Sequence, residues 1–191
     1  MRSLSTQHSL DIPMKPNDDI SPQELARLAV ETFTTERTVI EPPAEPQGVL
    51  SQRAGCFVTL RTLDGKLRGC IGTLIPEYPN VAREIIHNGI SAATRDPRFM
   101  PVTVSELTNI SYGVDVLSPP ERVGGPEDLD PNTYGVVIET VDGRRRGLLL
   151  PRISGLDTVE DQWFAVHSKA GIKVGTPVFV ERFTVTRFGK E

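Results

Sequence analysis

The fold of the chain is decided by the stretch CFVTLRTLDGKLRGCIGTL, residues 56–74. Apolar and polar residues alternate on both sides of Asp64-Gly65, and an Asp-Gly pair between two such runs is the strongest short signal for a β-hairpin. We therefore expect one strand over residues 56–61, a tight turn at Asp64-Gly65 and a second strand over residues 66–74.

The length of this turn decides which side chains share a face of the hairpin. A two-residue turn pairs Thr59 with Cys70 and leaves Arg68, Cys70 and Thr59 together on the polar face. A three-residue turn slips the pairing by one and puts Cys56 and Cys70 on a common face. We favour the first register because it gathers the apolar side chains on one side, although the turn chemistry permits either.

Three helices are expected around this hairpin. Ser21-Pro22-Gln23-Glu24 has the composition of a capping box and precedes apolar residues at helical spacing, which predicts a helix over 21–36. A second apolar stripe predicts a helix over 80–94, ended by Asp96-Pro97. A third helix is expected over 158–170, with Gly171 as its left-handed cap.

Further strands are expected over residues 109–117, over 136–140 and 145–150 around a second Asp-Gly turn, and over 178–188. Together these elements predict an α+β fold, with a mostly antiparallel sheet of about five or six strands and three main helices. The pattern shows no repeat and no second core. Residues 1–20 are polar and without a period, so we expect a disordered N-terminal tail before a single domain over 21–191.

Composition narrows the classes of partner. The formal net charge of −4 offers no basic surplus for a polyanion, which argues against nucleic acid. No apolar run is long enough to cross a bilayer or to form a secretory signal, so we expect no membrane partner and a cytoplasmic location. Two cysteines in such a chain are expected to be free thiols.

The hexapeptide Leu67-Arg68-Gly69-Cys70-Ile71-Gly72 resembles the hallmark motif of the AMMECR-one domain family. Four more segments resemble motifs of the same family in the same order, over roughly residues 21–188: Arg95-Asp96-Pro97-Arg98-Phe99, Val116-Leu117-Ser118-Pro119-Pro120-Glu121, Arg146-Gly147-Leu148-Leu149-Leu150-Pro151 and Lys169-Ala170-Gly171.

This resemblance implies a two-lobed structure with a cleft lined by the hexapeptide, in a family whose biochemical function is unassigned. Relatives are often encoded beside a Memo-like protein and a radical S-adenosylmethionine enzyme, the AmmeMemoRadiSam system, which implies these two proteins as partners. Many relatives carry a cysteine just before the Lys-Ala-Gly segment, where this chain has His167-Ser168. A role that needs a second thiol there is not expected.

Cys70 is the candidate nucleophile. Beside Arg68 its pKa would fall from about 8.5 to about 7, which raises the thiolate fraction at neutral pH to about half. The alternative is that Cys70, framed by Gly69 and Gly72, is a small apolar residue where another backbone approaches closely.

The remaining candidate residues follow from what a nucleophile needs. We take His167 as the candidate base, whereas His87 falls off the apolar stripe of its helix and is expected to face solvent. Arg68 and Arg98 would form a fork for a carboxylate or phosphate, with Thr59, Gly69 and Gly72 as further ligand contacts. The alternative for Arg98 is an ion pair with Asp96 or Glu106 that fixes the loop.

No metal-ligand spacing and no phosphate loop occurs, so no metal and no tightly bound cofactor is expected. Two functions remain open. The first is a cysteine-dependent enzyme or group-transfer component that acts on a small anionic or electrophilic metabolite. The second is a non-catalytic protein whose cleft holds a peptide, a metabolite or a Memo-like protein.

Overall fold

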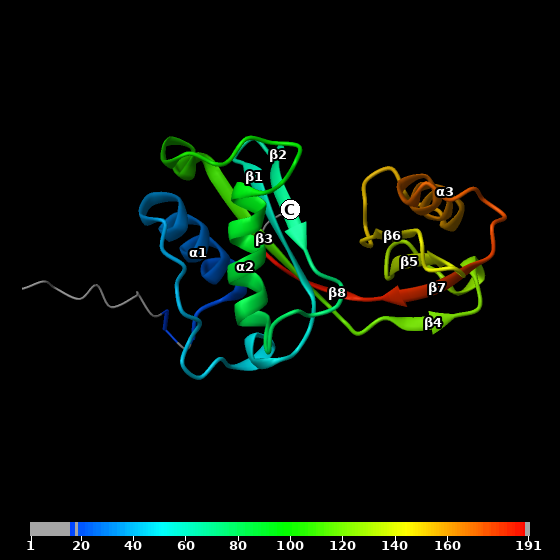
Figure 1. The fold of residues 1–191 in the computed structure, drawn as a ribbon, viewed down its shortest axis with the longest axis horizontal. Coiled ribbons are helices and arrows are strands. Elements are labelled where there is room, and N and C mark those ends of the chain that lie inside the picture. Colours follow the sequence, from blue (N-terminus) through cyan, green and yellow to red (C-terminus); the bar gives the residue numbers. More distant parts are fainter. Residues whose placement is uncertain (1–15, 18, 190–191) are drawn as a thin grey trace, which may run out of the picture.

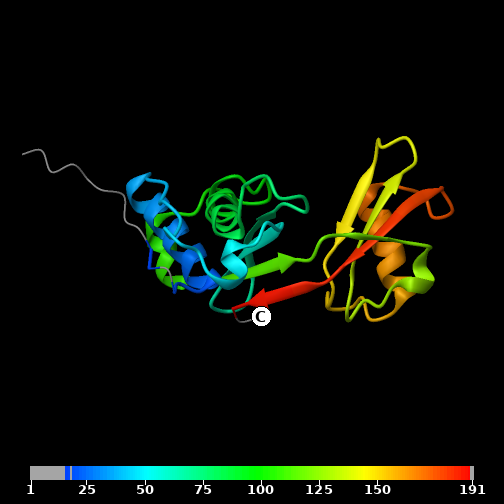
Figure 2. The same ribbon diagram turned by 90° about the horizontal axis from the view of Figure 1, so that it is seen from below.

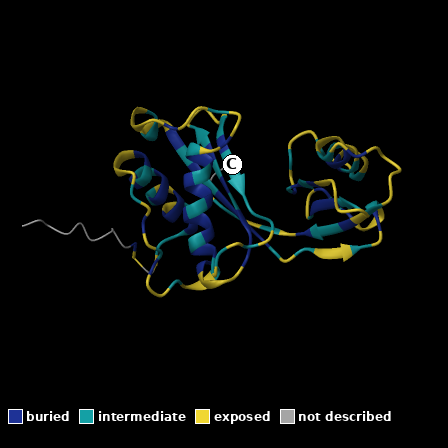
Figure 3. Cartoon of the chain, viewed as in Figure 1, coloured by how far each residue is buried: buried dark blue, intermediate teal, exposed yellow. Residues whose placement is uncertain are grey.

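The computed structural model describes residues 16, 17 and 19–189, so residues 1–15 and 18 of the tail predicted over residues 1–20 lie outside the described residues. Two lobes lie along the longest axis of the molecule (Figure 1 and Figure 2). The predicted α+β class is confirmed: the described residues form three α-helices and two antiparallel sheets of four strands each. Both lobes contain buried segments (Figure 3).

The large lobe is built on a sheet with the strand order β2-β1-β3-β8. Helices α1 and α2 pack against one face of this sheet, where Cys56, Val58 and Leu60 are buried. The elements of this lobe are α1 (Pro22–Glu36), η1 (Gly48–Ser51), β1 (Cys56–Thr62), β2 (Leu67–Gly72), α2 (Val81–Thr94), η2 (Val104–Asn109), β3 (Ile110–Leu117) and β8 (Val185–Phe188). Neither helix covers the other face of the sheet, which lines the cleft described below.

The small lobe has a sheet with the order β4-β7-β5-β6, against which α3 packs. It has its own core, formed around Val136, Ile138 and Val166. Its elements are β4 (Glu121–Val123), η3 (Pro126–Asp128), β5 (Gly135–Thr140), β6 (Arg146–Leu149), α3 (Val159–Ala170) and β7 (Val178–Phe183). The expectation that there is no second core is therefore wrong. The residues of this core come from short segments spread along the sequence, so no continuous apolar pattern revealed it.

The chain crosses between the lobes twice, after β3 and between β7 and β8. The two crossings are joined by hydrogen bonds, one from Ser118 N to Thr184 O (3.0 Å) and one from Thr184 N to Ser118 Oγ (2.9 Å). The single strand expected over 178–188 is divided at Thr184, because the chain leaves one sheet there and enters the other. This division and the unexpected short strand β4 raise the number of strands above the predicted five or six.

The helices begin and end within one residue of the predicted bounds, since their caps are local. Ser21 and Glu24 form the capping box of α1, and Gly171 closes α3 with a φ of 63°. Asn80 caps α2 by accepting a hydrogen bond from Arg83 N at 3.0 Å. These caps satisfy backbone groups that a helix terminus otherwise leaves unpaired.

The β1–β2 hairpin combines the two registers that the sequence permits. Its turn has three residues, with Thr62 N donating to Lys66 O, and Arg61 pairs with Leu67. The register then shifts between Leu60 and Arg61, and Thr59 pairs with Cys70 as we favoured. A bulge at Arg68 on β2 accounts for the shift, because it absorbs the extra residue of the turn.

Candidate functional site

A cleft of about 550 Å³ lies between the two lobes. One wall is the face of the large-lobe sheet that the helices do not cover, and the other comes from β6, the segment after it and the end of α3. The lining residues of the large lobe are Phe57, Thr59, Arg61, Leu67, Cys70, Arg98, Ser111, Gly113, Asp115, Arg187 and Phe188, and those of the small lobe are Leu148, Leu150, Pro151, Arg152, Ile153, Ser154 and Lys169.

The strand register places the polar residues of the large-lobe wall side by side. Thr59 of β1 lies between Cys70 of β2 and Gly113 of β3. Phe57, two residues before Thr59 on β1 and closer to the small lobe, lies opposite Asp115. Asp115 in turn pairs with Arg187 of β8. Cys70 and Thr59 are thus brought together in the cleft, as predicted.

Cys70 is held at the free edge of the sheet by two side chains. Its backbone N–H donates to Asp96 Oδ2 at 2.8 Å, and its carbonyl accepts from Arg98 Nη2 at 3.4 Å. Asp96 and Arg98 therefore occupy positions that a neighbouring strand would take. The Cys70 Sγ lies 3.2 Å from Thr59 Oγ1, as expected for a closely spaced pair across two antiparallel strands.

The pKa of the Cys70 thiol is raised, not lowered, from its ordinary value of 9.0. Burial is the largest cause, and it outweighs the opposing effects of the Thr59 hydrogen bond and the Arg98 charge. Asp115 and Asp96 raise the pKa further. Cys70 is consequently a neutral thiol at neutral pH, and the expectation of a thiolate in the free protein is wrong.

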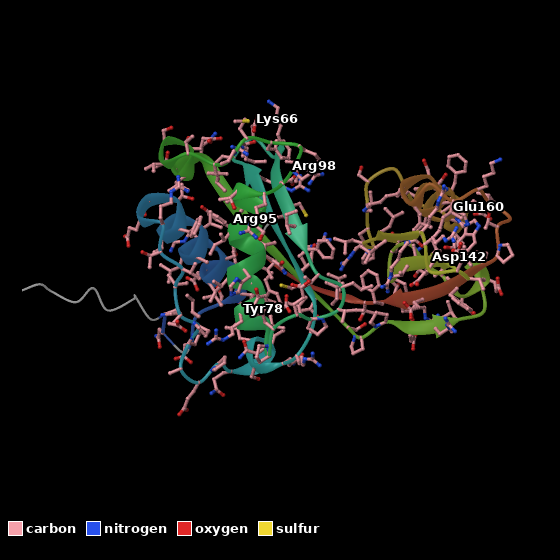
Figure 4. The ribbon with its side chains drawn as sticks, viewed as in Figure 1. Lys66, Tyr78, Arg95, Arg98, Asp142 and Glu160 are labelled. Atoms are coloured by element: carbon pink, nitrogen blue, oxygen red, sulfur yellow. The ribbon has the colours of Figure 1, made fainter. Side chains whose placement is uncertain are left out.

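Arg98 is fixed at the rim of the cleft by Asp96. Its Nε and Nη2 donate to the two carboxylate oxygens of Asp96, at 2.9 and 2.6 Å. The Asp96 carboxylate is almost fully buried, and these hydrogen bonds from Arg98 hold its pKa below the ordinary range. The Arg98 guanidinium is half exposed and lies on the side of the large lobe that faces the small lobe (Figure 4). Of the two alternatives for Arg98, the ion pair with Asp96 is present, and Arg98 also lines the cleft.

Arg68 does not line the cleft, so the expectation that it shares a face with Cys70 is wrong. Its Nε donates to Glu106 Oε1 at 2.7 Å and its Nη2 donates to the carbonyl of Met100 at 3.0 Å. The hydrogen bond from Arg68 lowers the pKa of Glu106 to about 2. The bulge at Arg68 interrupts the alternation of side chains along β2, which is why the predicted fork with Arg98 does not form.

Gly69 and Gly72 serve packing and do not line the cleft, which corrects their assignment as ligand contacts. A Cβ on Gly69 would lie 2.3 Å from the carbonyl oxygen of Ala92, so the backbones of β2 and α2 meet there. A Cβ on Gly72 would lie 2.3 Å from the ring of Phe57. Close approach of another group thus explains both glycines.

His167 is buried in the core of the small lobe and does not line the cleft, so the expectation that it serves as a base for Cys70 is wrong. Its Nδ1 lies 2.9 Å from the carbonyl oxygen of Trp163. His87 is also away from the cleft and stacks on Tyr78 with the ring centroids 4.1 Å apart. The sequence could not reveal this placement of His167, because it did not reveal the second core.

Lys169 is the residue of α3 that does reach the cleft, and the sequence analysis did not assign it a role. Its Nζ donates to the carbonyl of Leu148 at 2.8 Å. Burial lowers the pKa of its ammonium group, and the nearby Cys70 and Arg98 also act on it electrostatically. The only signal for it was its place in the Lys169-Ala170-Gly171 segment.

The cleft is strongly cationic although the chain as a whole is anionic. Among the described residues, five cationic side chains line it, together with the carboxylate of Asp115, which accepts from Arg187 Nε at 2.7 Å, while the Asp96 carboxylate is paired with Arg98 at the rim. The cations are Arg61, Arg98, Arg152, Lys169 and Arg187. Arg152 adopts a left-handed conformation with a φ of 58°, and such strained residues cluster at functional sites.

In the part of the chain that the structure describes, no three His, Cys, Asp or Glu residues come together in a way that could hold a metal ion. Within the same residues, no helix is both long and apolar enough to span a membrane.

Comparisons with known proteins show which family the chain resembles. The AMMECR1 family model matches residues 23–191. A protein of Thermotoga maritima is 51% identical over 161 residues, which cover 83% of this chain and 91% of that protein. A Clostridium acetobutylicum protein is 42% identical over 166 residues, which are 86% of this chain but 35% of that longer protein.

A solved structure extends the agreement to three dimensions. The crystal structure of an uncharacterised protein from Pyrococcus horikoshii superposes with a TM-score of 0.81 at 32% identity. The alignment covers 89% of this chain and 90% of that one. The family match, the relatives and the shared fold lead to one conclusion: the chain belongs to the AMMECR1 (AMMECR-one) family.

Proposed function

We propose that this protein binds a small anionic ligand in the cleft between its lobes, with the anion between Arg98 and Lys169 and next to Cys70. The observation that carries the proposal is the cationic lining of the cleft in an anionic chain: five cationic side chains line it, against the carboxylates of Asp115 and of Asp96, which is paired with Arg98. A volume of about 550 Å³ suits a small molecule. Like charges gathered in one hollow repel each other, and a bound anion relieves that repulsion.

The two central cations are held in place before any ligand arrives. Asp96 fixes the Nε and Nη2 groups of Arg98, which leaves its Nη1 for a carboxylate or phosphate oxygen. The carbonyl of Leu148 orients the Nζ of Lys169. Because both groups are already ordered, binding costs less conformational entropy than it would with free side chains. An anion beside Lys169 would also restore the pKa that burial lowers.

A cysteine-dependent group-transfer reaction is the second candidate function, because the Cys70 thiol lines the same cleft. The raised pKa means that this thiol must lose its proton when the ligand binds. A neutral Lys169, which its lowered pKa favours, would accept that proton, whereas a Lys169 that holds an anion is charged and would not. Binding is therefore the primary proposal.

The cellular setting of this proposal is a cytoplasm with reducing conditions, which the free thiols of Cys56 and Cys70 support. A Memo-like protein and a radical S-adenosylmethionine enzyme remain proposed partners. A cleft of this volume holds a metabolite better than it holds a protein surface. We accordingly propose that any link to these proteins passes through a shared small molecule.

Two disulfide reagents of different charge test the proposal. Dithiobis(nitrobenzoate) is a dianion and dithiodipyridine is neutral, and both release a chromophore when they react with a thiol. Cys56 is fully buried, so Cys70 is the thiol that reacts in the folded protein. A change in the pKa of Cys70 alters both rate constants and therefore cancels in their ratio. The ratio thus measures the attraction of the cleft for an anion.

We expect this ratio to fall by about threefold to tenfold in Lys169→Gln and in Arg98→Gln, in line with the effect of single charges on the encounter with a charged ligand. Arg144→Gln is the matched control, since it removes the same charge from an exposed turn outside the cleft. The proposal fails if neither cleft variant changes the ratio more than the control does.

A further inference from the structure

The lining of the cleft is divided into a cationic part and an apolar part. From this division we infer that the ligand is an anion joined to a flat apolar body, such as an aromatic carboxylate. The inference rests on the proposed function, because it takes the anion to lie between Arg98 and Lys169. It adds the chemical class of the rest of the ligand.

Three apolar residues of the lining, Phe57, Leu148 and Leu150, lie at the junction of the lobes. These side chains come from both lobes, and all three pack on one buried cluster at the junction, formed by Leu117, Val137 and Phe183. They are therefore held in place by this cluster and are half-buried. An inorganic anion would leave this apolar surface in contact with water.

The ring of Phe57 lies against the backbone of β2. It fills the place that a Cβ of Gly72 would occupy, at 2.3 Å from that position. Phe57 is two residues before Thr59 on the same face of β1, and Thr59 pairs with Cys70. An apolar body that extends from an anion next to Cys70 toward the small lobe therefore meets the ring of Phe57.

Lys169 connects the two parts of the lining. Its Nζ donates to the carbonyl of Leu148, the residue whose side chain belongs to the apolar part. The cation thus lies next to the backbone of a residue of the apolar part, which fits a compact ligand of one or two rings. A long chain with a distant charge fits this spacing poorly.

Gly113 provides room for a ring on the floor of the cleft. It lies opposite Thr59, in the middle of the large-lobe wall. A Cβ there would meet only the carbonyl oxygens of Phe188 and Thr59, at 3.9 and 4.0 Å, so no close packing explains the glycine. Gly69 and Gly72 differ in this respect, because neighbouring atoms exclude a Cβ at both. The missing side chain of Gly113 leaves space in the cleft itself.

Three small molecules separate the contribution of the charge from that of the ring. Naphthoate carries both, acetate carries only the charge, and naphthalenemethanol carries only the ring. The full chain is alkylated with the neutral reagent iodoacetamide, and mass spectrometry follows the peptide that contains Cys70. Each compound is titrated for the concentration that halves the rate of alkylation.

We expect naphthoate to protect Cys70 at a concentration at least about tenfold lower than acetate does, as burial of an aromatic ring predicts. It should also protect at a lower concentration than naphthalenemethanol, because the two share the ring and differ in the charge. If acetate protects as well as naphthoate does, the inference is overturned and the proposed function stands. If naphthalenemethanol equals naphthoate, the charge contributes nothing and the proposed function is overturned. If no compound protects, both are overturned.

Two variants test the position of the ligand's ring and the position of its charge separately. Gly113→Val fills the floor of the cleft, so it should weaken protection by naphthoate about tenfold and leave protection by acetate within about twofold. Lys169→Gln should weaken protection by both anions. If Gly113→Val does not fold, Leu150→Thr replaces it as the test of the apolar part. Unchanged protection by naphthoate in the folded variant overturns the inference.

Discussion

At the scale of single residues, Asp96 positions both Cys70 and Arg98 in the cleft. Its carboxylate accepts hydrogen bonds from the backbone N–H of Cys70 and from the N–H, Nε and Nη2 of Arg98. An asparagine has one acceptor oxygen, and its NH2 group would face one of these donors. We expect Asp96→Asn to lower the free energy of unfolding by about 2 kcal/mol at neutral pH.

The pH dependence of this effect follows from the lowered pKa of Asp96. A carboxyl group with a lowered pKa in the folded state stabilises the protein fully above its unfolded pKa of about 3.9, and this contribution is lost as the pH falls through the lower folded value. The difference between wild type and Asp96→Asn in urea unfolding should therefore shrink below about pH 4. Asp157→Asn, an exposed control, should change stability by less than about 0.5 kcal/mol. A comparable effect from both substitutions would contradict the account of Asp96.

The thiol of Cys70 gives a second prediction at the residue scale. Because its pKa is raised, alkylation by iodoacetamide should reach half of its maximal rate above pH 9.0, the ordinary value for the group. The hydrogen bond with Thr59 lowers the pKa, so Thr59→Val should move the profile to still higher pH. The pH profile is measured on the Cys70 peptide by mass spectrometry. A midpoint below the ordinary value would show that the cations outweigh burial.

At the scale of elements, the position of β2 depends on its contact with α2. Gly69 meets the carbonyl oxygen of Ala92, and a Cβ at 2.3 Å from that oxygen cannot be accommodated unless the strand moves. We expect Gly69→Ala to destabilise the large lobe by about 1–3 kcal/mol. Gly113→Ala on the same sheet is the control, since its Cβ would have only ordinary contacts. Urea midpoints that are equal for the two variants would mean that the contact with α2 is unimportant.

The elements with local signals are the ones that the sequence predicts well. The capping box at Ser21, the cap at Asn80 and the left-handed Gly171 bound their helices by hydrogen bonds within a few residues. The bulge at Arg68 and the break at Thr184 have no such signal. The first compensates for a turn whose length the sequence left open, and the second exists because two sheets share one strand-like segment.

The residues of the candidate site were likewise predicted where nearby sequence positions them and missed where packing between distant segments does. Cys70, Thr59 and Arg98 were predicted because the hairpin and the loop after α2 keep them close in sequence to residues that position them. Lys169 was missed, and His167 was preferred to it, because the side of α3 that faces the cleft is decided by the packing of the small lobe. No pattern within α3 distinguishes a residue facing a core from one facing a second lobe.

At the scale of the whole molecule, the ligand would bind where two separately packed lobes meet. The cluster of Leu117, Val137 and Phe183 joins them, together with the hydrogen bonds between Ser118 and Thr184. Among the described residues, the large-lobe core contains 22 buried residues and the small-lobe core contains seven. Since buried apolar surface is the main source of stability, the small lobe should open more easily than the large one.

Native-state hydrogen exchange tests this difference. Most residues of α2 are buried, whereas α3 buries only Gln162, Val166 and His167 among its described residues. Amides of α3 should therefore exchange at least about tenfold faster than those of α2, through openings that leave the large lobe folded. Naphthoate should slow exchange in α3 more than in α2, because Lys169 contributes the small-lobe cation that would hold the anion. Equal exchange in both helices would mean that the lobes open as one unit, and a ligand effect confined to α2 would remove Lys169 from the binding site.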